Sequence, residues 1–351
     1  MPQIINCHIH TFTQQSVPSR FPPFPFNFLS RNRLTRVPLV WLLRSLWPWS
    51  SRDLPNRYAN FIAIAAFKTQ KEIFEIVRGR YPLDTKFVIL PMDLRGMQRG
   101  NPRQSIIEQH EELKKLAEEY PNQVIPFIHI DPRSGSTLAG PKPLDFIERF
   151  HRDGFKGIKL YPPLGYDAAD PIVMPIYEFA NEHNLPIMTH CSRGGVKGKN
   201  FDDQHIEVTT APHRYRSVLD KFKKLRLCLA HFGGGSEWES YLNKNWIDDS
   251  TPLEKMDWLS QISTMIKSGN YPNLFTDISY TIFKFERYTP VLKVFLSDQR
   301  IQDKTLFGSD YYMIEQEKFS ERQLSLRLRA ELGEALFWKT AHDNPLKYLN
   351  G

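Results

Sequence analysis

Short apolar runs alternate with amphipathic stretches along most of the chain, and this alternation constrains the fold more than any other feature of the sequence. Near-continuous apolar runs are typical of parallel strands that are covered on both faces. Helical patterns lie between them, for example at 103–119, 143–153 and 252–267. Eight strands alternating with helices predict a closed (β/α)8 barrel rather than an open sheet. The expected strands are 3–10, 86–93, 123–131, 155–161, 185–191, 225–231, 273–280 and 304–310.

One segment interrupts the alternation. Residues 11–56 are rich in Pro, Arg, Phe and Trp and directly follow the first expected strand. A segment there is a long insertion on the barrel face that carries active sites. We interpret it as a lid or a dimer contact, and a membrane-surface helix around 39–49 is the alternative. The whole chain, 1–351, is otherwise expected to form a single barrel domain, since such barrels reach ~400 residues with insertions.

The composition limits the compartment and the partners. The chain has three cysteines, an odd number in no CxxC spacing, which is typical of a reducing compartment. It has neither a signal-peptide pattern nor ~18 consecutive apolar residues. The formal charge of +7 favours anionic ligands. We therefore expect a cytoplasmic homodimer that acts on a small anionic molecule, with no nucleic-acid or membrane partner.

Residues of metal-ligand or acid/base type end five of the eight expected strands. Side chains two apart on a strand share a face, so two imidazoles near the end of the first strand can grip one ion. The ends of parallel barrel strands converge on one mouth, where catalytic residues gather. Cys7 and Cys191 precede and follow His8 and His190 directly, so their side chains are expected on the opposite face of the strand. The residues are His8 and His10, then Lys159, His190, His231 and Asp310.

These residue types suit a catalytic divalent metal. Neutral imidazole nitrogens bind zinc, manganese or iron, and a carboxylate adds anionic charge. We expect zinc, with Mn²⁺ or Fe²⁺ as alternatives, to activate water near neutral pH. Asp310 would bind the metal and accept a proton, while His231 would act as general acid or base. Arg193, three residues after His190, would bind a substrate carboxylate, and a solvated loop arginine is the alternative.

The motifs in this order resemble the amidohydrolase superfamily, in its "amidohydrolase 2" branch. That branch includes aminocarboxymuconate-semialdehyde decarboxylase, related aromatic-acid decarboxylases and hydrolases. The resemblance implies that His8, His10, His190 and Asp310 hold one metal, with His231 beside its water. It also implies that Lys159 matches a lysine that binuclear members carboxylate to bridge a second metal, which His190 and His231 would then hold. The motifs are NCHIH at 6–10, GIKLYPP at 157–163, MTHC at 188–191, LAHFGG at 229–234 and LFGSD at 306–310.

Two reactions fit this set of residues. The leading hypothesis is hydrolysis of an amide, ester or lactone by metal-activated water. The alternative is non-oxidative decarboxylation of a small unsaturated or aromatic carboxylic acid. Two metals with a modified Lys159 would favour hydrolysis, whereas one metal with a free lysine would favour the lyase. A barrel that only binds a ligand is a third reading, because a fold alone does not establish catalysis.

Overall fold

The computed structural model of the protein describes residues 2–21, 29–30, 33–45, 59–60, 62–64, 66–243, 250–281, 285–311, 313–316 and 321–351. Within these residues two parallel sheets follow the chain order, β1-β2-β3 and β4-β5-β6-β7-β8-β9. All eight expected strands are present, the third as two pieces. The strands are β1 (Ile5–Ile9), β2 (Lys86–Ile89), β3 (Val124–Pro126), β4 (Ile128–His129), β5 (Ile158–Leu160), β6 (Ile187–Thr189), β7 (Leu227–Leu229), β8 (Leu274–Asp277) and β9 (Thr305–Leu306).

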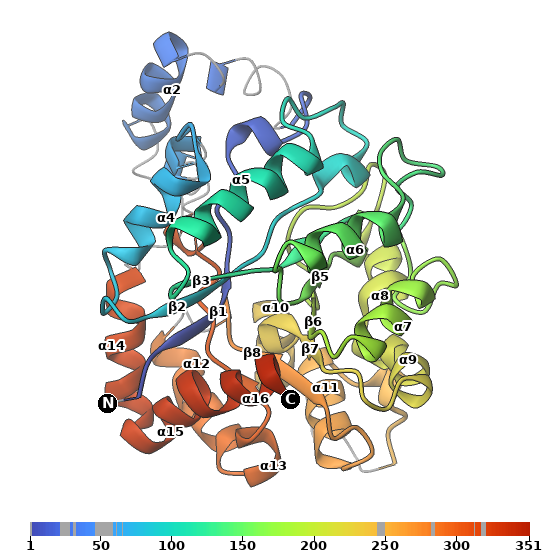
Figure 1. The fold of residues 1–351 in the computed structure, drawn as a ribbon. Coiled ribbons are helices and arrows are strands. Elements are labelled where there is room, and N and C mark those ends of the chain that lie inside the picture. The colour runs from blue at the N-terminus through green and yellow to red at the C-terminus, as the bar shows by residue number, and fades with distance from the viewer. Residues whose placement is uncertain are drawn as a thin grey trace.

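The two sheets meet at both of their edges. β3 and β4 are separated only by Phe127, so they form one interrupted strand between β2 and β5. At the other edge, the Cys7 N–H donates to the Phe307 carbonyl at 2.9 Å, and Ile9 bridges Tyr311 in parallel. The strands therefore pass once around in chain order, as expected for the (β/α)8 barrel, with helices on the outside (Figure 1).

Helices form in the stretches 103–119, 143–153 and 252–267, as the sequence predicts, and others form outside the predicted stretches, such as α8 (Asp203–Thr210) and α14 (Glu321–Leu332). Two of the helices begin at a capping box, in which a Ser or Thr and a Glu three residues later satisfy free backbone N–H groups: Thr69 with Glu72, and Ser105 with Glu108. The helices are α2 (Arg33–Ser45), α4 (Gln70–Arg78), α5 (Ile106–Glu119), α6 (Pro143–Arg152), α7 (Met174–Glu182), α8 (Asp203–Thr210), α9 (Arg216–Lys221), α10 (Gly235–Asn243), α11 (Trp258–Lys267), α12 (Phe285–Leu296), α13 (Gln299–Gln302), α14 (Glu321–Leu332), α15 (Glu334–Trp338) and α16 (Asn344–Asn350).

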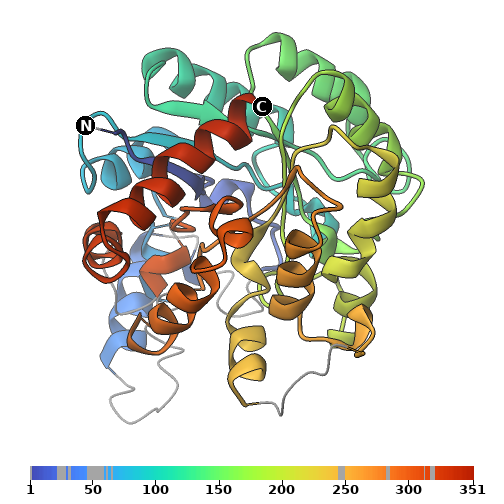
Figure 2. The ribbon, with the colours of Figure 1, turned by 90° about the horizontal axis from the view of Figure 1, so that it is seen from below.

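The core has two parts, one between strands and helices and one inside the barrel. The C-terminal helices, red in Figure 2, complete the inner part, because Tyr348 of α16 packs on Phe275 of β8 with ring centroids 5.4 Å apart. That contact fills the end of the barrel opposite the carboxyl ends of the strands. The inner cluster consists of Ile5, Cys7, Val88, Leu90, Phe127, Met188, Cys228, Ala230, Phe275, Leu306 and Tyr348.

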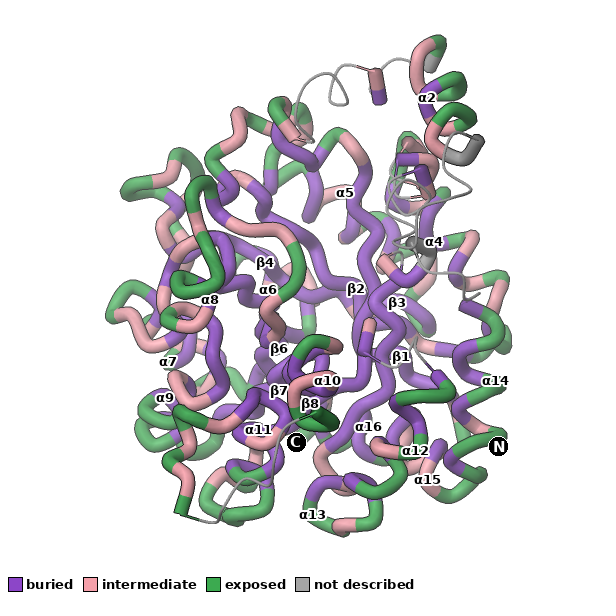
Figure 3. Tube along the Cα trace, turned by 180° about the vertical axis from the view of Figure 1, so that it is seen from behind, coloured by how far each residue is buried: buried purple, intermediate pink, exposed green. Residues whose placement is uncertain are grey.

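The insertion after β1 is described only in part. Residues 22–28, 31–32 and 46–56 of the expected segment 11–56 lie outside the described residues, so its role as a lid or dimer contact stays a prediction. Its described helix, α2, lies beyond α4 at the edge of the molecule in two opposite views (Figures 1 and 3). In the described part of the chain, no helix is both long and apolar enough to span a bilayer.

Candidate metal centre

His8 and His10 lie at the carboxyl end of β1, where a local irregularity turns both rings toward the site. The pairing of β1 with β2 shifts register between Asn6 and Ile9. Such bulges redirect side chains and are common next to active sites. Consequently Cys7 packs in the inner cluster while its neighbour His8 also reaches the site, so the expectation that these two face opposite ways is wrong.

Hydrogen bonds fix which nitrogen of each of these rings is free. His8 Nδ1 lies 2.9 Å from the Asp277 carboxylate, and His10 Nδ1 lies 2.8 Å from the Leu90 carbonyl. Both partners accept, so the proton of each neutral ring belongs on Nδ1 and the lone pair on Nε2. The two Nε2 atoms face the same oxygen, Asp310 Oδ1, at 3.8 Å from His8 and 3.2 Å from His10. Partners of this kind orient histidine ligands in metal sites.

Asp310 follows β9 in a left-handed backbone conformation, with φ of +59°. This region is unfavourable for a residue with a Cβ and costs roughly 1–2 kcal/mol. A bond from the Asp310 N–H to the His8 carbonyl at 2.8 Å holds the turn. Burial alone would raise the pKa of the Asp310 carboxyl, but the adjacent His10, His8 and His231 rings lower it overall. The strained turn thus presents an ionised carboxylate to both imidazoles.

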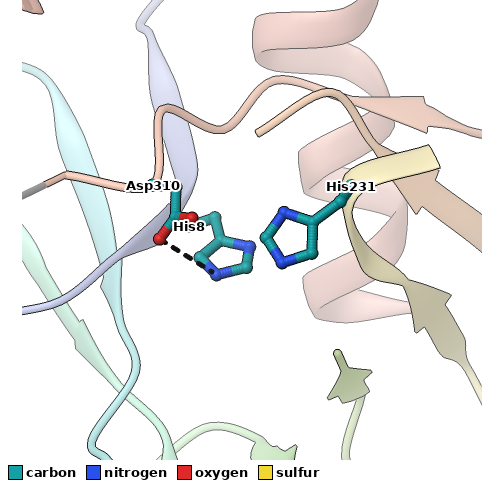
Figure 4. Close-up of side chains that lie close together, drawn as sticks. All are labelled: His8, His231 and Asp310. Atoms are coloured by element: carbon teal, nitrogen blue, oxygen red, sulfur yellow. Dashed lines mark ion pairs between the residues drawn. The ribbon is translucent and has the colours of Figure 1, made fainter. Parts of the chain in front are cut away.

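His8, His231 and Asp310 form a group that fits a metal ion. Within the described residues, their ligand atoms all lie within 4.8 Å of one another, and all three residues are buried (Figure 4). His8 Nε2 and Asp310 Oδ1 have no hydrogen-bond partner there. Buried polar atoms without partners are costly, and a missing ion is one accepted explanation for them. Imidazole nitrogen and carboxylate oxygen are ligands that zinc, manganese and iron accept.

His190 and His231 face each other beside this group. His190 Nε2 lies 3.0 Å from the Gly194 carbonyl, and His231 Nδ1 lies 2.9 Å from the Ser279 carbonyl. Each carbonyl needs a proton from the ring, so the neutral rings keep lone pairs on His190 Nδ1 and His231 Nε2, which are only 3.0 Å apart. Two lone pairs at this distance repel unless a proton or cation lies nearby. The structure thus places the predicted ligand His190 beside the candidate metal site. The compact group of ligand atoms, however, contains His231 and not His190.

Lys159 is a buried amine without a hydrogen-bond partner among the described residues. It lies in β5 and pairs in register with His129 and Met188 of the neighbouring strands. Burial lowers its pKa to about 8, although Asp277 and Asp310 oppose this shift. Burial, followed by the positive charge of Lys159, lowers the pKa of His8 to about 3. The centre therefore combines neutral imidazoles with one amine that loses its proton only slightly above neutral pH.

Asp277, at the end of β8, is a residue that the sequence reasoning did not select. Its Oδ2 binds His8 Nδ1, and its Oδ1 accepts the N–H groups of His231 at 2.9 Å and Ser279 at 3.0 Å. The Ser279 hydroxyl also lies 3.0 Å from Nδ1 of both His8 and His231. Asp277 and Ser279 therefore connect the His8 and His231 rings through hydrogen bonds. The sequence held only a partial signal, because Asp277 lies inside the seventh expected strand, 273–280, and is the last residue only of the observed strand β8.

Arg193 is engaged elsewhere. Its Nε donates to Glu237 at 2.6 Å, its terminal nitrogen pairs with Glu207 at 2.5 Å, and its guanidinium lies 4.5 Å from the Trp258 ring centre. Two carboxylates already neutralise this cation, so its contacts give no support to the predicted role in binding a substrate carboxylate. They also differ from the solvated loop arginine, because the side chain joins the loop after β6 to α8, α10 and α11.

Comparison with known proteins decides the family. The model of a family described as amidohydrolase matches residues 95–350, which is most of the chain. The chain belongs to the amidohydrolase family. Members of this family are metal-dependent enzymes, in agreement with the centre described above. A search of curated proteins finds no match.

Solved structures of other proteins share this fold although their sequences are only 11–14% identical to this chain. A 5-carboxyvanillate decarboxylase from Sphingomonas paucimobilis matches with a TM-score of 0.59 at 13% identity, over 99% of each chain. A probable 2-pyrone-4,6-dicarboxylic acid hydrolase from Acinetobacter baumannii matches with 0.56 at 11%, over 99% of this chain and 100% of the other. A manganese complex of 5-carboxyvanillate decarboxylase from Novosphingobium aromaticivorans matches with 0.57 at 14%, over 100% and 96%. At such identities the likeness establishes the barrel and leaves the reaction open.

Proposed function

We propose that the protein is a metal-dependent hydrolase that cleaves an amide, ester or lactone bond of a small anionic substrate. The observation that carries the proposal is the buried group of His8, His231 and Asp310, with unpartnered His8 Nε2 and Asp310 Oδ1. His8, His10 and Asp310, together with His190 or His231, would hold the metal. We expect zinc, with manganese or iron as alternatives. Bound there, a divalent ion would supply a Lewis acid that polarises a carbonyl and acidifies water.

The protein's own groups suit the proton transfers of hydrolysis. The net effect of the surroundings is to lower the pKa values of His8, His231 and Asp310, so each is in its basic form near neutral pH. Asp310 would take the proton of the attacking water and return it to the departing nitrogen or oxygen. If His190 rather than His231 completes the metal ligands, the Nε2 of His231 would accept a second hydrogen bond from the water or the substrate. A site with several bases and one amine acid suits water activation better than protonation of carbon.

Decarboxylation is the second candidate, and Lys159 favours it. Its unpartnered amine, mostly protonated at neutral pH, can pair with a substrate carboxylate or donate a proton. The decarboxylases with the same fold support this possibility for the present chain. In this reaction the bond between carbon and the carboxylate breaks, CO₂ leaves, and a proton from the protein or water replaces it on carbon. Hydrolysis is favoured over decarboxylation because the centre holds more basic than acidic groups.

One assay separates the two candidates. The metal-loaded enzyme would be offered small aromatic carboxylates, and lactones and amides of dicarboxylic acids, with CO₂ release and water-dependent acid formation followed in parallel. The proposal expects acid formation without CO₂, and its loss in Asp310→Asn but not in Asp220→Asn, which alters an exposed carboxylate. CO₂ release without consumption of water would replace the proposal with the decarboxylase. Metal counting and detection of a carboxylated Lys159 would supply independent support for a binuclear hydrolase.

A further inference from the structure

Helix α2 presents an apolar stripe to solvent. Leu34, Val37, Trp41 and Leu42 are 82%, 62%, 66% and 42% exposed, whereas Leu39 is buried. The exposed positions are spaced by three, four and one residues, which places them on one face of a helix. A tryptophan and three aliphatic side chains on one face form a concentrated patch, unlike scattered single exposed residues. Figure 3 shows this helix at the margin of the molecule, with exposed and partly buried residues along it.

The charge of the surrounding sequence indicates what this stripe meets. Between Thr11 and Arg52 the sequence contains six arginines and no Asp, Glu or Lys. This segment therefore carries +6 of the formal net charge of +7. A basic segment around a helix with Trp and Leu on one face is typical of helices that lie in the interface of an anionic membrane. Apolar burial and attraction to acidic headgroups act together there.

A second copy of the chain fits this surface less well. In a twofold dimer built on α2, the same basic segment of both protomers would be brought together. Like charges would then approach without a carboxylate in either segment to neutralise them. An acidic lipid surface has the opposite sign and accepts a tryptophan at the headgroup level.

We propose that the apolar stripe of α2, formed by Leu34, Val37, Trp41 and Leu42, binds the protein reversibly to the surface of a bilayer that contains anionic lipid. The helix lies in the interface and does not span the membrane, in keeping with the lack of a spanning helix among the described residues. The surface alternative of the sequence analysis is thereby preferred to the expectation of no membrane partner. The proposal is independent of the reaction at the metal centre.

Sedimentation with vesicles tests the proposal. The full-length protein is mixed with vesicles of phosphatidylcholine alone or with phosphatidylglycerol added. We expect binding to the mixed vesicles only, weakening when salt rises from ~0.1 M to ~1 M, because the Debye length falls from ~10 Å to ~3 Å. Trp41→Glu should weaken binding by at least about tenfold. The matched control is Val294→Glu on α12, where the native side chain is 69% exposed but lies outside the basic segment, and it should bind as the wild type does.

Three results would overturn the proposal. One is no sedimentation with either vesicle, and another is equal loss of binding in Trp41→Glu and Val294→Glu. The third is a wild-type dimer in analytical ultracentrifugation that Trp41→Glu dissociates, without vesicle binding, which would assign the stripe to a second copy. Circular dichroism of both variants distinguishes loss of the surface from loss of the fold, and two exposed positions are chosen so that both should fold.

Discussion

Replacing Lys159 with methionine should stabilise the metal-free protein near neutral pH. Methionine has a similar length and no charge, so it fills the same buried position in β5 without a charge to desolvate. The Lys159 amine has no hydrogen-bond partner among the described residues that would offset this desolvation. A buried side chain that lowers stability is expected in a catalytic centre, because function rather than stability determines which residue is kept there.

The magnitude follows from the pKa of the amine. Burial lowers it from 10.5 to about 8, in spite of the opposing charges of Asp277 and Asp310. A difference of about 2.5 units at 1.36 kcal/mol per unit gives about 3 kcal/mol. Below pH 8 both the folded and the unfolded chain are protonated, so the folded protein bears this full cost. Between pH 8 and 10.5 only the unfolded chain keeps the proton, so wild-type stability gains relative to the variant as pH rises.

Denaturant unfolding at pH 7 and pH 10, after chelation and in bicarbonate-free buffer, measures this difference. Lys159→Met should exceed the wild type by about 3 kcal/mol at pH 7, and most of that gain should disappear by pH 10. Lys224→Met replaces an exposed lysine and should change stability by less than about 0.5 kcal/mol at either pH. A Lys159→Met protein that is less stable than the wild type at pH 7, or a gain that does not depend on pH, would refute the reasoning.

Three further predictions concern the ligands and their support. Asp277→Asn should lower metal affinity by about 10–100-fold in a chelator competition, because the amide no longer holds the His8 ring as an ionised acceptor does; unchanged affinity would exclude this role. His231→Ala should weaken metal binding more than His190→Ala does, because His231 belongs to the compact group with His8 and Asp310, and the reverse order would restore His190 as the ligand. The His8 ring of the metal-free protein should not titrate between pH 7.5 and about 5.5 in an NMR pH series, since burial and the positive charge of Lys159 lower its pKa to about 3; a titration in that window would contradict this shift.

The repeating pattern of the barrel was predictable because it depends on local sequence. Each of the eight apolar runs contains a strand, and the helix starts coincide with residues such as Thr69 and Ser105 that can cap them. Exact strand ends were less predictable, since Phe127 interrupts the third strand where its neighbours change from β2 to β5.

The site was predictable as a set of residues but not as a geometry. Alternation along a strand places His8 opposite Cys7, and only the register shift against β2 turns both inward. No local pattern reveals that Arg193 pairs with Glu207 and Glu237, because these contacts depend on how the loop after β6 meets α8 and α10. Asp277 differs from these cases, since it is an acidic residue within an expected strand, 273–280, and could have been considered there.

Metal analysis of the purified protein tests the central claim most directly. After dialysis against zinc or manganese and removal of free metal, inductively coupled plasma mass spectrometry counts the ions per chain. The account predicts at least one tightly bound dication in the wild type and its loss in His8→Ala, with the circular dichroism spectrum unchanged. A folded wild-type protein that retains no dication, or a His8→Ala protein that binds as much as the wild type, would contradict the assignment of a metal centre at the carboxyl ends of β1 and β9.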